Sequence, residues 1–167
     1  AIYSPLPAAP AALVAPAPNL CRNASISLLK ATGKVKCLED KIEAMKDTLN
    51  MEGVHTQHVG ISHTRWATHG APSDLNCHPH RSGEVNEFVV VHNGIITNYK
   101  DIKAFLETKG YKFESETDTE CIAKLIKHIR SQNTHYTFRQ LVEQTMSQLE
   151  GAFACVFKST MYPGECV

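Results

Sequence analysis

Two short stretches of the sequence combine side chains that can hold and polarise a small polar molecule. In the stretch HTRWATHG, Arg65 offers five fixed N–H donors that suit a carboxylate. Thr68 and His69 add hydrogen-bonding groups beside Trp66, which is the only tryptophan of the chain. Further along, Asp118 can pair with an ammonium group. Because an arginine and an aspartate can bind the carboxylate and the ammonium group of an α-amino acid, these residues predict a pocket for an amino acid.

The second stretch is HNG, which follows a continuous apolar run. Asn93 can project a side-chain amide there, and Gly94 allows its backbone N–H to approach a ligand closely. Two donors aimed at one point form an oxyanion hole, which stabilises negative charge on a carbonyl oxygen. Asn-Gly after a strand is also a common turn sequence, so the residues alone leave both interpretations open.

Hydrophobic periodicity predicts the elements that must position these residues. Strands are predicted at 25–31, 55–64, 86–94 and 152–157, with a short one at 111–113. Helices are predicted at 35–51, 99–109, 119–130 and 138–150. Candidate N-caps are Asn98, Thr117 or Asp118, and Thr137. This mixture of strands and helices predicts an α+β fold, with a sheet layered against helices.

Composition narrows the class of protein. Hydrophobic residues make up 43% of the 167 residues, which is enough for a core. The 17 basic and 17 acidic residues cancel, so no global field favours nucleic acid or a membrane surface. No apolar run is long enough to span a bilayer. The six cysteines form no CxxC pair, which is typical of reduced thiols and predicts a cytoplasmic protein.

The N-terminal residues differ from the rest of the chain. The first twenty hold seven Ala, five Pro and no charged residue. Since each proline removes a backbone donor, we expect residues 1–24 to be a disordered Pro/Ala-rich segment. The folded part is then expected at residues 25–167, as one partial domain.

Three longer stretches carry a family resemblance. They are SHTRWATHGAPSDLNCHPH, EFVVVHNGIITNYKDIKAFLETKGYKFESETDTECIAKLI and LEGAFACVFKS. In this order they resemble the glutaminase domain of eukaryotic glutamine:fructose-6-phosphate aminotransferases (isomerising), which are class II glutamine amidotransferases. The resemblance runs from about Ser25 to the end of the chain and is densest from Val59 to Lys158. It implies an N-terminal-nucleophile hydrolase-like αββα sandwich, with two sheets stacked between helix layers.

The resemblance also implies a role for each candidate residue. Arg65 would bind the α-carboxylate of glutamine, and Trp66, Thr68 and His69 would shape the pocket around it. Asp118 would bind the α-ammonium group. These roles agree with the chemistry that the residue types allow.

The oxyanion hole of this family would be formed by Asn93 and Gly94, but the nucleophile of the family has no match in the sequence. Family members attack the glutamine amide with an N-terminal Cys, in a start that reads Cys-Gly-Ile, whereas residue 1 here is Ala. We therefore expect the sandwich to be incomplete, with its first strand missing, and the isolated chain to be inactive.

Two functions are compatible with these features. The first is the glutaminase portion of the aminotransferase, in which glutamine hydrolysis supplies ammonia for glucosamine-6-phosphate synthesis. The alternative is a non-catalytic glutamine-binding or regulatory chain that associates with the full-length enzyme. The expected ligands are L-glutamine and L-glutamate, with no cofactor, nucleic acid or membrane. No metal is expected either, since the nine histidines match no zinc spacing such as HExxH.

Overall fold

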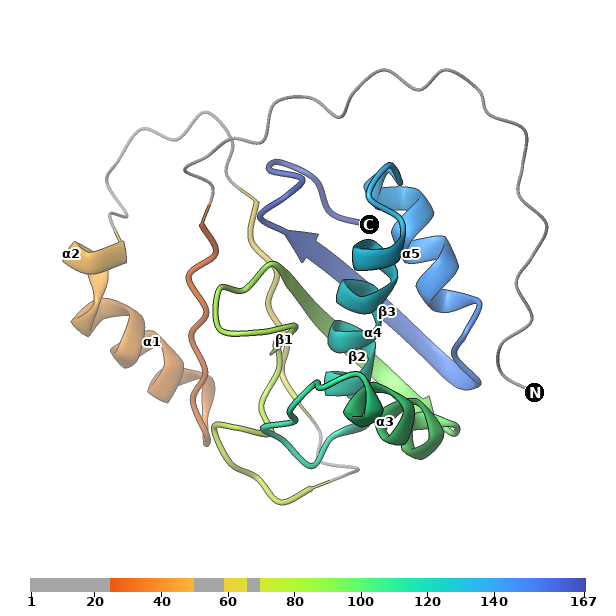
Figure 1. The fold of residues 1–167 in the computed structure, drawn as a ribbon. Coiled ribbons are helices and arrows are strands. Elements are labelled where there is room, and N and C mark those ends of the chain that lie inside the picture. The colour runs from red at the N-terminus through yellow and green to blue at the C-terminus, as the bar shows by residue number, and fades with distance from the viewer. Residues whose placement is uncertain (1–24, 50–58, 66–69) are drawn as a thin grey trace.

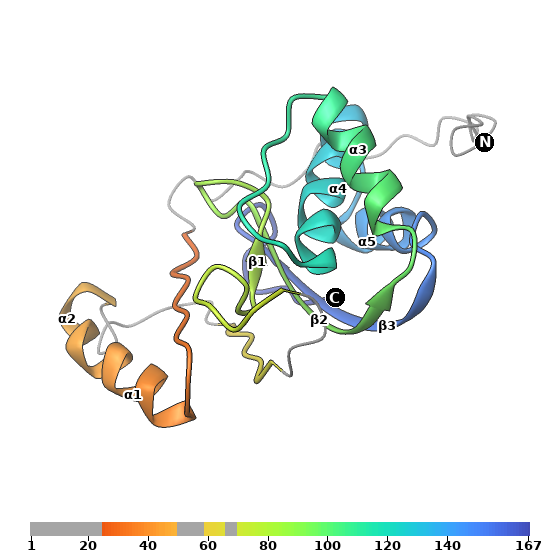
Figure 2. The same ribbon diagram turned by 90° about the horizontal axis from the view of Figure 1, so that it is seen from below.

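The computed structural model describes residues 25–49, 59–65 and 70–167. Strands β1 (His80–Arg81), β2 (Phe88–Ile96) and β3 (Gly151–Ser159) form an antiparallel sheet in the order β1-β2-β3. Helices α3 (Tyr99–Thr108), α4 (Asp118–Gln132) and α5 (Phe138–Met146) cover one face of it (Figures 1 and 2). Helices α1 (Val35–Ala44) and α2 (Lys46–Leu49) lie to one side. The predicted α+β fold is therefore confirmed.

Strand β2 is the centre of this sheet. It pairs with β3 over nine residues, from Phe88 opposite Ser159 to Ile96 opposite Gly151. Its first four residues, 88–91, are all buried, as their continuous apolar character predicts. The predicted end at Gly94 is wrong, because pairing with β3 continues and the Ile96 side chain is fully buried in the core. The end of this strand is thus fixed by packing rather than by its Asn-Gly pair.

The core lies between the sheet and the three covering helices. Strand β2 contributes alternate residues to it, and each helix contributes an apolar stripe. Its largest fully buried apolar side chains are Phe88, Ile96, Leu106, Ile122, Ile126, Phe138, Leu141 and Phe157. These contacts hold the helices at fixed positions over the sheet, and so fix where α4 begins.

The helix boundaries follow local capping chemistry only in part. Thr137 caps the start of α5 with a capping box. The Thr137 hydroxyl accepts from the backbone N–H of Gln140, and Oε1 of the Gln140 side chain accepts from the backbone N–H of Thr137. Asn98 precedes α3 without capping it, since its side chain instead bonds to the backbone of residues 148 and 150. Helix α5 ends at Met146, short of the predicted residue 150.

Three predicted strands are wrong in the described residues. Residues 25–31, 59–64 and 111–113 belong to no strand, and residues 55–58 of one prediction lie outside the described part. Alternating apolar residues make a segment suitable for a sheet, but a strand also needs a neighbour for its backbone hydrogen bonds. No such partner lies beside these segments within the described chain.

The second face of the sheet is partly open. Val89 and Val91 are buried on it, whereas Ile95 is 46% and Val156 is 40% exposed. The described residues supply one sheet and one covering helix layer, so the second sheet and helix layer of an αββα sandwich stay a prediction. The predicted segment at 1–24 lies outside the described residues.

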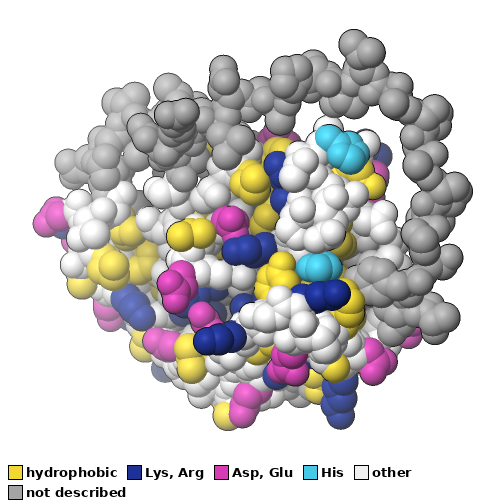
Figure 3. Space-filling model, viewed as in Figure 1, with side chains coloured by type: hydrophobic (Ala, Val, Ile, Leu, Met, Phe, Trp, Pro, Cys, Tyr) yellow, Lys and Arg dark blue, Asp and Glu magenta, His cyan; other side chains and the backbone are white. Residues whose placement is uncertain are grey.

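Charges are mixed over the surface of the molecule. On the face seen in Figure 3, basic and acidic side chains are interspersed rather than gathered by sign. Exposed ion pairs such as Lys36–Asp40 and Arg139–Glu143 show the same mixing within single helices. Among the helices of the described residues, none has both the length and the apolar character needed to cross a membrane.

Truncation of a core leucine should destabilise the fold strongly. Leu106 is fully buried, so Leu106→Ala should lower the free energy of unfolding by about 2–5 kcal/mol. Leu75 is 59% exposed, and Leu75→Ala should change the free energy of unfolding by less than about 0.5 kcal/mol. Urea unfolding followed by circular dichroism measures both. Equal effects of the two substitutions would contradict the packing described above.

Candidate functional site

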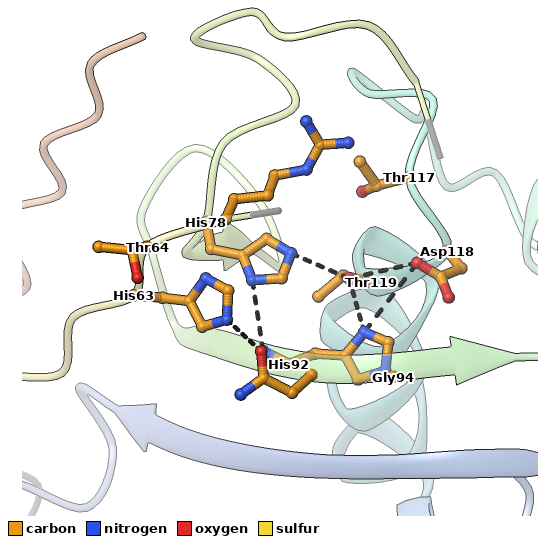
Figure 4. A pocket seen from close by; sticks show the side chains of 10 residues that line it. His63, Thr64, His78, His92, Gly94, Thr117, Asp118 and Thr119 are labelled. Carbon is orange, nitrogen blue, oxygen red and sulfur yellow. Dashed lines mark hydrogen bonds and ion pairs between the residues drawn. The ribbon is translucent and has the colours of Figure 1, made fainter. Parts of the chain in front are cut away.

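A small cavity of about 170 Å³ lies where the end of β2 meets the start of α4 (Figure 4). Its volume is below the roughly 300–1,000 Å³ of sites for drug-sized ligands, so it suits a small metabolite. Within the described residues, four separate parts of the chain line it: residues 63–65, the loop residue 78, β2 and the start of α4. The lining residues are His63, Thr64, Arg65, His78, His92, Asn93, Gly94, Thr117, Asp118 and Thr119.

Asp118 is fixed between the sheet and helix α4. It is only 4% exposed, and its Oδ2 accepts a hydrogen bond of 2.9 Å from the backbone N–H of Ile96. It is the first residue of α4, where the positive end of the helix dipole favours a carboxylate. Its other oxygen, Oδ1, lies 3.4 Å from the Thr119 hydroxyl and 4.0 Å from Nδ1 of His92. One carboxylate oxygen is thus used for structure, and the other faces the polar side chains around the cavity (Figure 4).

Asn93 lines the cavity from strand β2. Its Oδ1 is 2.6 Å from Nε2 of His63, and because an amide oxygen can only accept, the histidine donates this bond. The side-chain NH2 of Asn93 is then left to donate elsewhere. Gly94 follows it with φ of +125°, a backbone conformation that favours glycine. Both residues line the cavity, and their role as an oxyanion hole stays a prediction.

Arg65 also lines the cavity, and its Nη2 donates to the carbonyl oxygen of Gly70 at 3.2 Å. The structure therefore places Arg65, Asn93, Gly94 and Asp118 around one space, although they lie far apart in the sequence. Trp66, Thr68 and His69 lie outside the described residues, and their roles stay predictions. This arrangement puts a guanidinium group and a carboxylate in one small site.

A cluster of histidines surrounds the cavity. The ring of His78 lies 4.4 Å from that of His63, 5.1 Å from that of His80 and 6.3 Å from that of His92. Burial, followed by the effect of the other histidines, lowers the pKa of His78 to about 2. Burial, followed by the nearby charge of Lys30, lowers the pKa of His80 to about 3. These two rings are therefore neutral at physiological pH.

His78 and His80 were not predicted as residues of this site, because the histidines of the sequence match no zinc spacing. Among the described residues, no three His, Cys, Asp or Glu side chains are grouped so that they could hold a metal ion. The signal that could have placed them is CHPH, which puts the half-buried His78 two residues before the buried His80, the first residue of the strand that pairs with β2. Thr119 also lines the cavity, and it was missed because a threonine near a helix start is usually read as a cap.

The segment before α4 is held by a buried acid. Glu120 is 2% exposed and accepts hydrogen bonds from the backbone N–H groups of Glu114 and Ser115 and from the Ser115 hydroxyl. It also pairs with Lys124 at 3.0 Å. Burial alone would raise the pKa of Glu120, but these bonds outweigh it and hold the pKa below its ordinary value of 4.5. This network fixes the backbone that leads into Asp118.

Asn76 joins the same segment to the preceding loop. Its side-chain NH2 donates to the Ala71 carbonyl at 2.9 Å, and its Oδ1 accepts from the Glu116 N–H at 3.1 Å. It is 4% exposed, so these bonds satisfy a buried amide. The loop after Arg65 and the start of α4 are therefore held together by one side chain, which the sequence analysis did not single out.

Residues 63–161 match the model of a known family, described as a glutamine amidotransferase domain. The chain belongs to this family. The match includes all the residues that line the cavity. It agrees with the resemblance to glutamine amidotransferases that the sequence carries.

Curated relatives of the chain include two aminotransferases. The chain is 58% identical over 144 residues to glutamine–fructose-6-phosphate aminotransferase (isomerizing) 2 of Homo sapiens, covering 85% of this chain and 21% of that protein. It is 48% identical over 147 residues to glutamine–fructose-6-phosphate aminotransferase (isomerizing) of Saccharomyces cerevisiae, covering 86% of this chain and 20% of that one. The chain thus spans about a fifth of the length of these relatives. Among solved structures, it is 31% identical to the glutamine phosphoribosylpyrophosphate amidotransferase of B. subtilis, with a TM-score of 0.47 over 59% of this chain and 20% of that one.

A side chain at position 94 should separate two strands of the sheet. A Cβ on Gly94 would lie 2.1 Å from the Ala152 carbonyl oxygen and 2.7 Å from the Phe153 Cα. Gly94→Ala should therefore lower the free energy of unfolding by about 3 kcal/mol or more. Gly110 also has a positive φ, of +87°, but a Cβ there meets nothing within 4 Å, so Gly110→Ala should cost only about 1–2 kcal/mol. Urea unfolding compares them, and equal costs would argue against the close strand contact.

The buried histidines should make the fold sensitive to mild acid. The folded-state pKa values of His78 and His80 lie below the ordinary value of 6.5, so the unfolded chain takes up protons first as the pH falls. The free energy of unfolding therefore keeps its full value above pH 6.5 with respect to these two rings. Between pH 6.5 and about pH 3 it falls with falling pH, by at most about 1.4 kcal/mol per pH unit for each ring. Urea midpoints at about pH 7.5 and about pH 5 measure this loss. His80→Gln should reduce the difference between the two midpoints, and an unchanged difference would contradict burial of a neutral ring.

Proposed function

We propose that this chain is the glutaminase portion of a glutamine–fructose-6-phosphate aminotransferase, and that its cavity binds L-glutamine and its product L-glutamate. The observation that carries the proposal is the placement of Arg65 and Asp118 around the same cavity as Asn93 and Gly94. Family membership and the names of the relatives support it. In the longer enzyme, the ammonia released from glutamine would serve glucosamine-6-phosphate synthesis.

The charges of the cavity match an α-amino acid. Arg65 binds the α-carboxylate, and Oδ1 of Asp118 accepts from the α-ammonium group. Because His78 and His80 stay neutral, the Asp118 carboxylate is not offset by positive charge on these two rings. The side-chain NH2 of Asn93 and the N–H of Gly94 then stabilise the oxygen of the side-chain amide during attack. Trp66, Thr68 and His69 complete the pocket in this proposal, which needs no cofactor.

The attacking thiol must come from outside the described residues. No cysteine of the described part of the chain lines the cavity. Burial raises the pKa of both Cys121 and Cys155 to about 12, so these thiols carry no thiolate at neutral pH and are poor nucleophiles. This observation favours the second candidate function for the isolated chain, a glutamine-binding or regulatory chain that associates with the full-length aminotransferase. The proposed location is the cytoplasm, where thiols stay reduced.

Loss of either charge should weaken glutamine binding. Asp118→Asn and Arg65→Gln should each raise the dissociation constant for L-glutamine and L-glutamate roughly tenfold or more, because a charged ligand group then loses its partner. Asp101 lies exposed on α3, so Asp101→Asn changes the net charge as Asp118→Asn does and should leave binding unaltered. Isothermal titration calorimetry measures all three variants.

A ligand analogue makes this experiment specific to Asp118. Glutamine without its α-amino group should bind the original chain weakly, and Asp118→Asn should weaken its binding little further. Tight binding of glutamine to Asp118→Asn would refute the proposed role of this residue. Absence of glutamine binding by the original chain would refute the proposed function of the cavity.

A further inference from the structure

The hydroxyl group of Thr119 contacts three polar side chains of the cavity at once. Its Oγ1 lies 2.9 Å from Nδ1 of His92, 3.2 Å from Nε2 of His78 and 3.4 Å from Oδ1 of Asp118 (Figure 4). Thr119 is 1% exposed, so water cannot replace these contacts. Its three partners come from three parts of the chain: strand β2, the loop before β1 and the first turn of α4.

The direction of these bonds follows from the atoms involved. The backbone N–H of His92 points to Nδ1 of His78 at 3.4 Å, so this nitrogen accepts and carries no proton. Because the His78 ring is neutral, its proton lies on Nε2, which donates to the Thr119 oxygen. The hydroxyl has a single proton, and because a carboxylate oxygen only accepts, it donates this proton to Oδ1 of Asp118. Nδ1 of His92, 2.9 Å from the Thr119 oxygen, is then the donor of the third contact.

The contact between Thr119 and Asp118 matters for Oδ1, the carboxylate oxygen that faces the ligand. Oδ2 of Asp118 is already occupied by the Ile96 N–H, so only Oδ1 remains to receive a cationic group. The Thr119 hydroxyl donates to one lone pair of Oδ1, which limits rotation of the carboxylate and leaves the second lone pair for the ligand. His78 is held against the same wall by the same hydroxyl group.

We propose that Thr119 is a positioning residue for recognition of the α-ammonium group: its hydroxyl orients the Asp118 carboxylate and holds His78 as the Nε2-protonated tautomer. This inference rests on the proposed function, because it concerns the same cavity and the same ligand. It adds a residue whose side chain acts through Asp118 rather than by direct contact with the ligand. The hydroxyl itself, rather than the shape of the threonine, carries the effect.

The tautomer of His78 in the original chain is the first test. Long-range ¹H–¹⁵N correlation spectra distinguish a neutral ring protonated on Nε2 from one protonated on Nδ1. A His78 ring protonated on Nε2 supports the assignment, and one protonated on Nδ1 overturns it. This measurement needs no ligand, so it is independent of whether the cavity binds glutamine.

Substitutions at position 119 provide the second test. Thr119→Val keeps the shape of the side chain and removes the hydroxyl, and it should weaken L-glutamine binding roughly tenfold, as expected when buried polar partners lose a hydrogen bond. Binding of the analogue without the α-amino group should change little. Thr119→Ser should restore most of the affinity. The matched control is Thr145→Val, since Thr145 is also fully buried and its hydroxyl donates to the Leu141 carbonyl, away from the cavity.

The outcomes separate this inference from the proposed function. If the original chain binds glutamine and Thr119→Val binds it equally well, with unchanged His78 signals, the role of Thr119 is refuted while the cavity remains a glutamine site. If Thr119→Val and Thr145→Val weaken binding equally, the effect is a general loss of stability and the inference also fails. If Thr119→Val does not fold, two other results decide. A His78 ring protonated on Nε2 in the original chain, together with most of the affinity in Thr119→Ser, supports the inference. A ring protonated on Nδ1 overturns it.

Discussion

The hydrogen bond from the Ile96 backbone N–H to the Asp118 carboxylate joins the end of β2 to the beginning of α4. Both groups are buried, so neither can exchange this partner for water without a large cost. The bond fixes the register between the strand that carries Asn93 and the helix that carries Thr119. The distances between the residues that β2 and α4 contribute to the cavity depend on that register.

A second set of buried polar groups keeps this junction rigid. Glu120 gathers the backbone N–H groups of the segment before α4, and Asn76 ties this segment to the loop that follows Arg65. Such groups contribute little net stability when satisfied, but each is expensive to leave unpaired, so the arrangement has few alternatives. The apolar core supplies the energy of folding, while these polar contacts select one geometry for the site.

The cavity combines fixed charge with neutral histidines. His78 and His80 remain unprotonated because they are buried next to one another and near cationic groups. His78 therefore lines the cavity as a neutral hydrogen-bonding group, and His80 lies behind it without adding a positive charge near Asp118. The same burial makes the fold sensitive to acid, so the groups that keep the cavity free of histidine charge also limit the pH range over which the fold is stable.

The sequence by itself determined the residue types of the site, the helices α3, α4 and α5, and the central strand, because motif chemistry and periodicity are local. It did not determine which alternating segments become strands: residues 25–31 and 111–113 have the pattern but no partner. Only the tertiary structure decided that Asp118 bonds to Ile96, that His78 lines the cavity and that Thr119 contacts three side chains. These are contacts between residues distant in the chain, and their geometry is set by the packing of helices on the sheet, which no local pattern records.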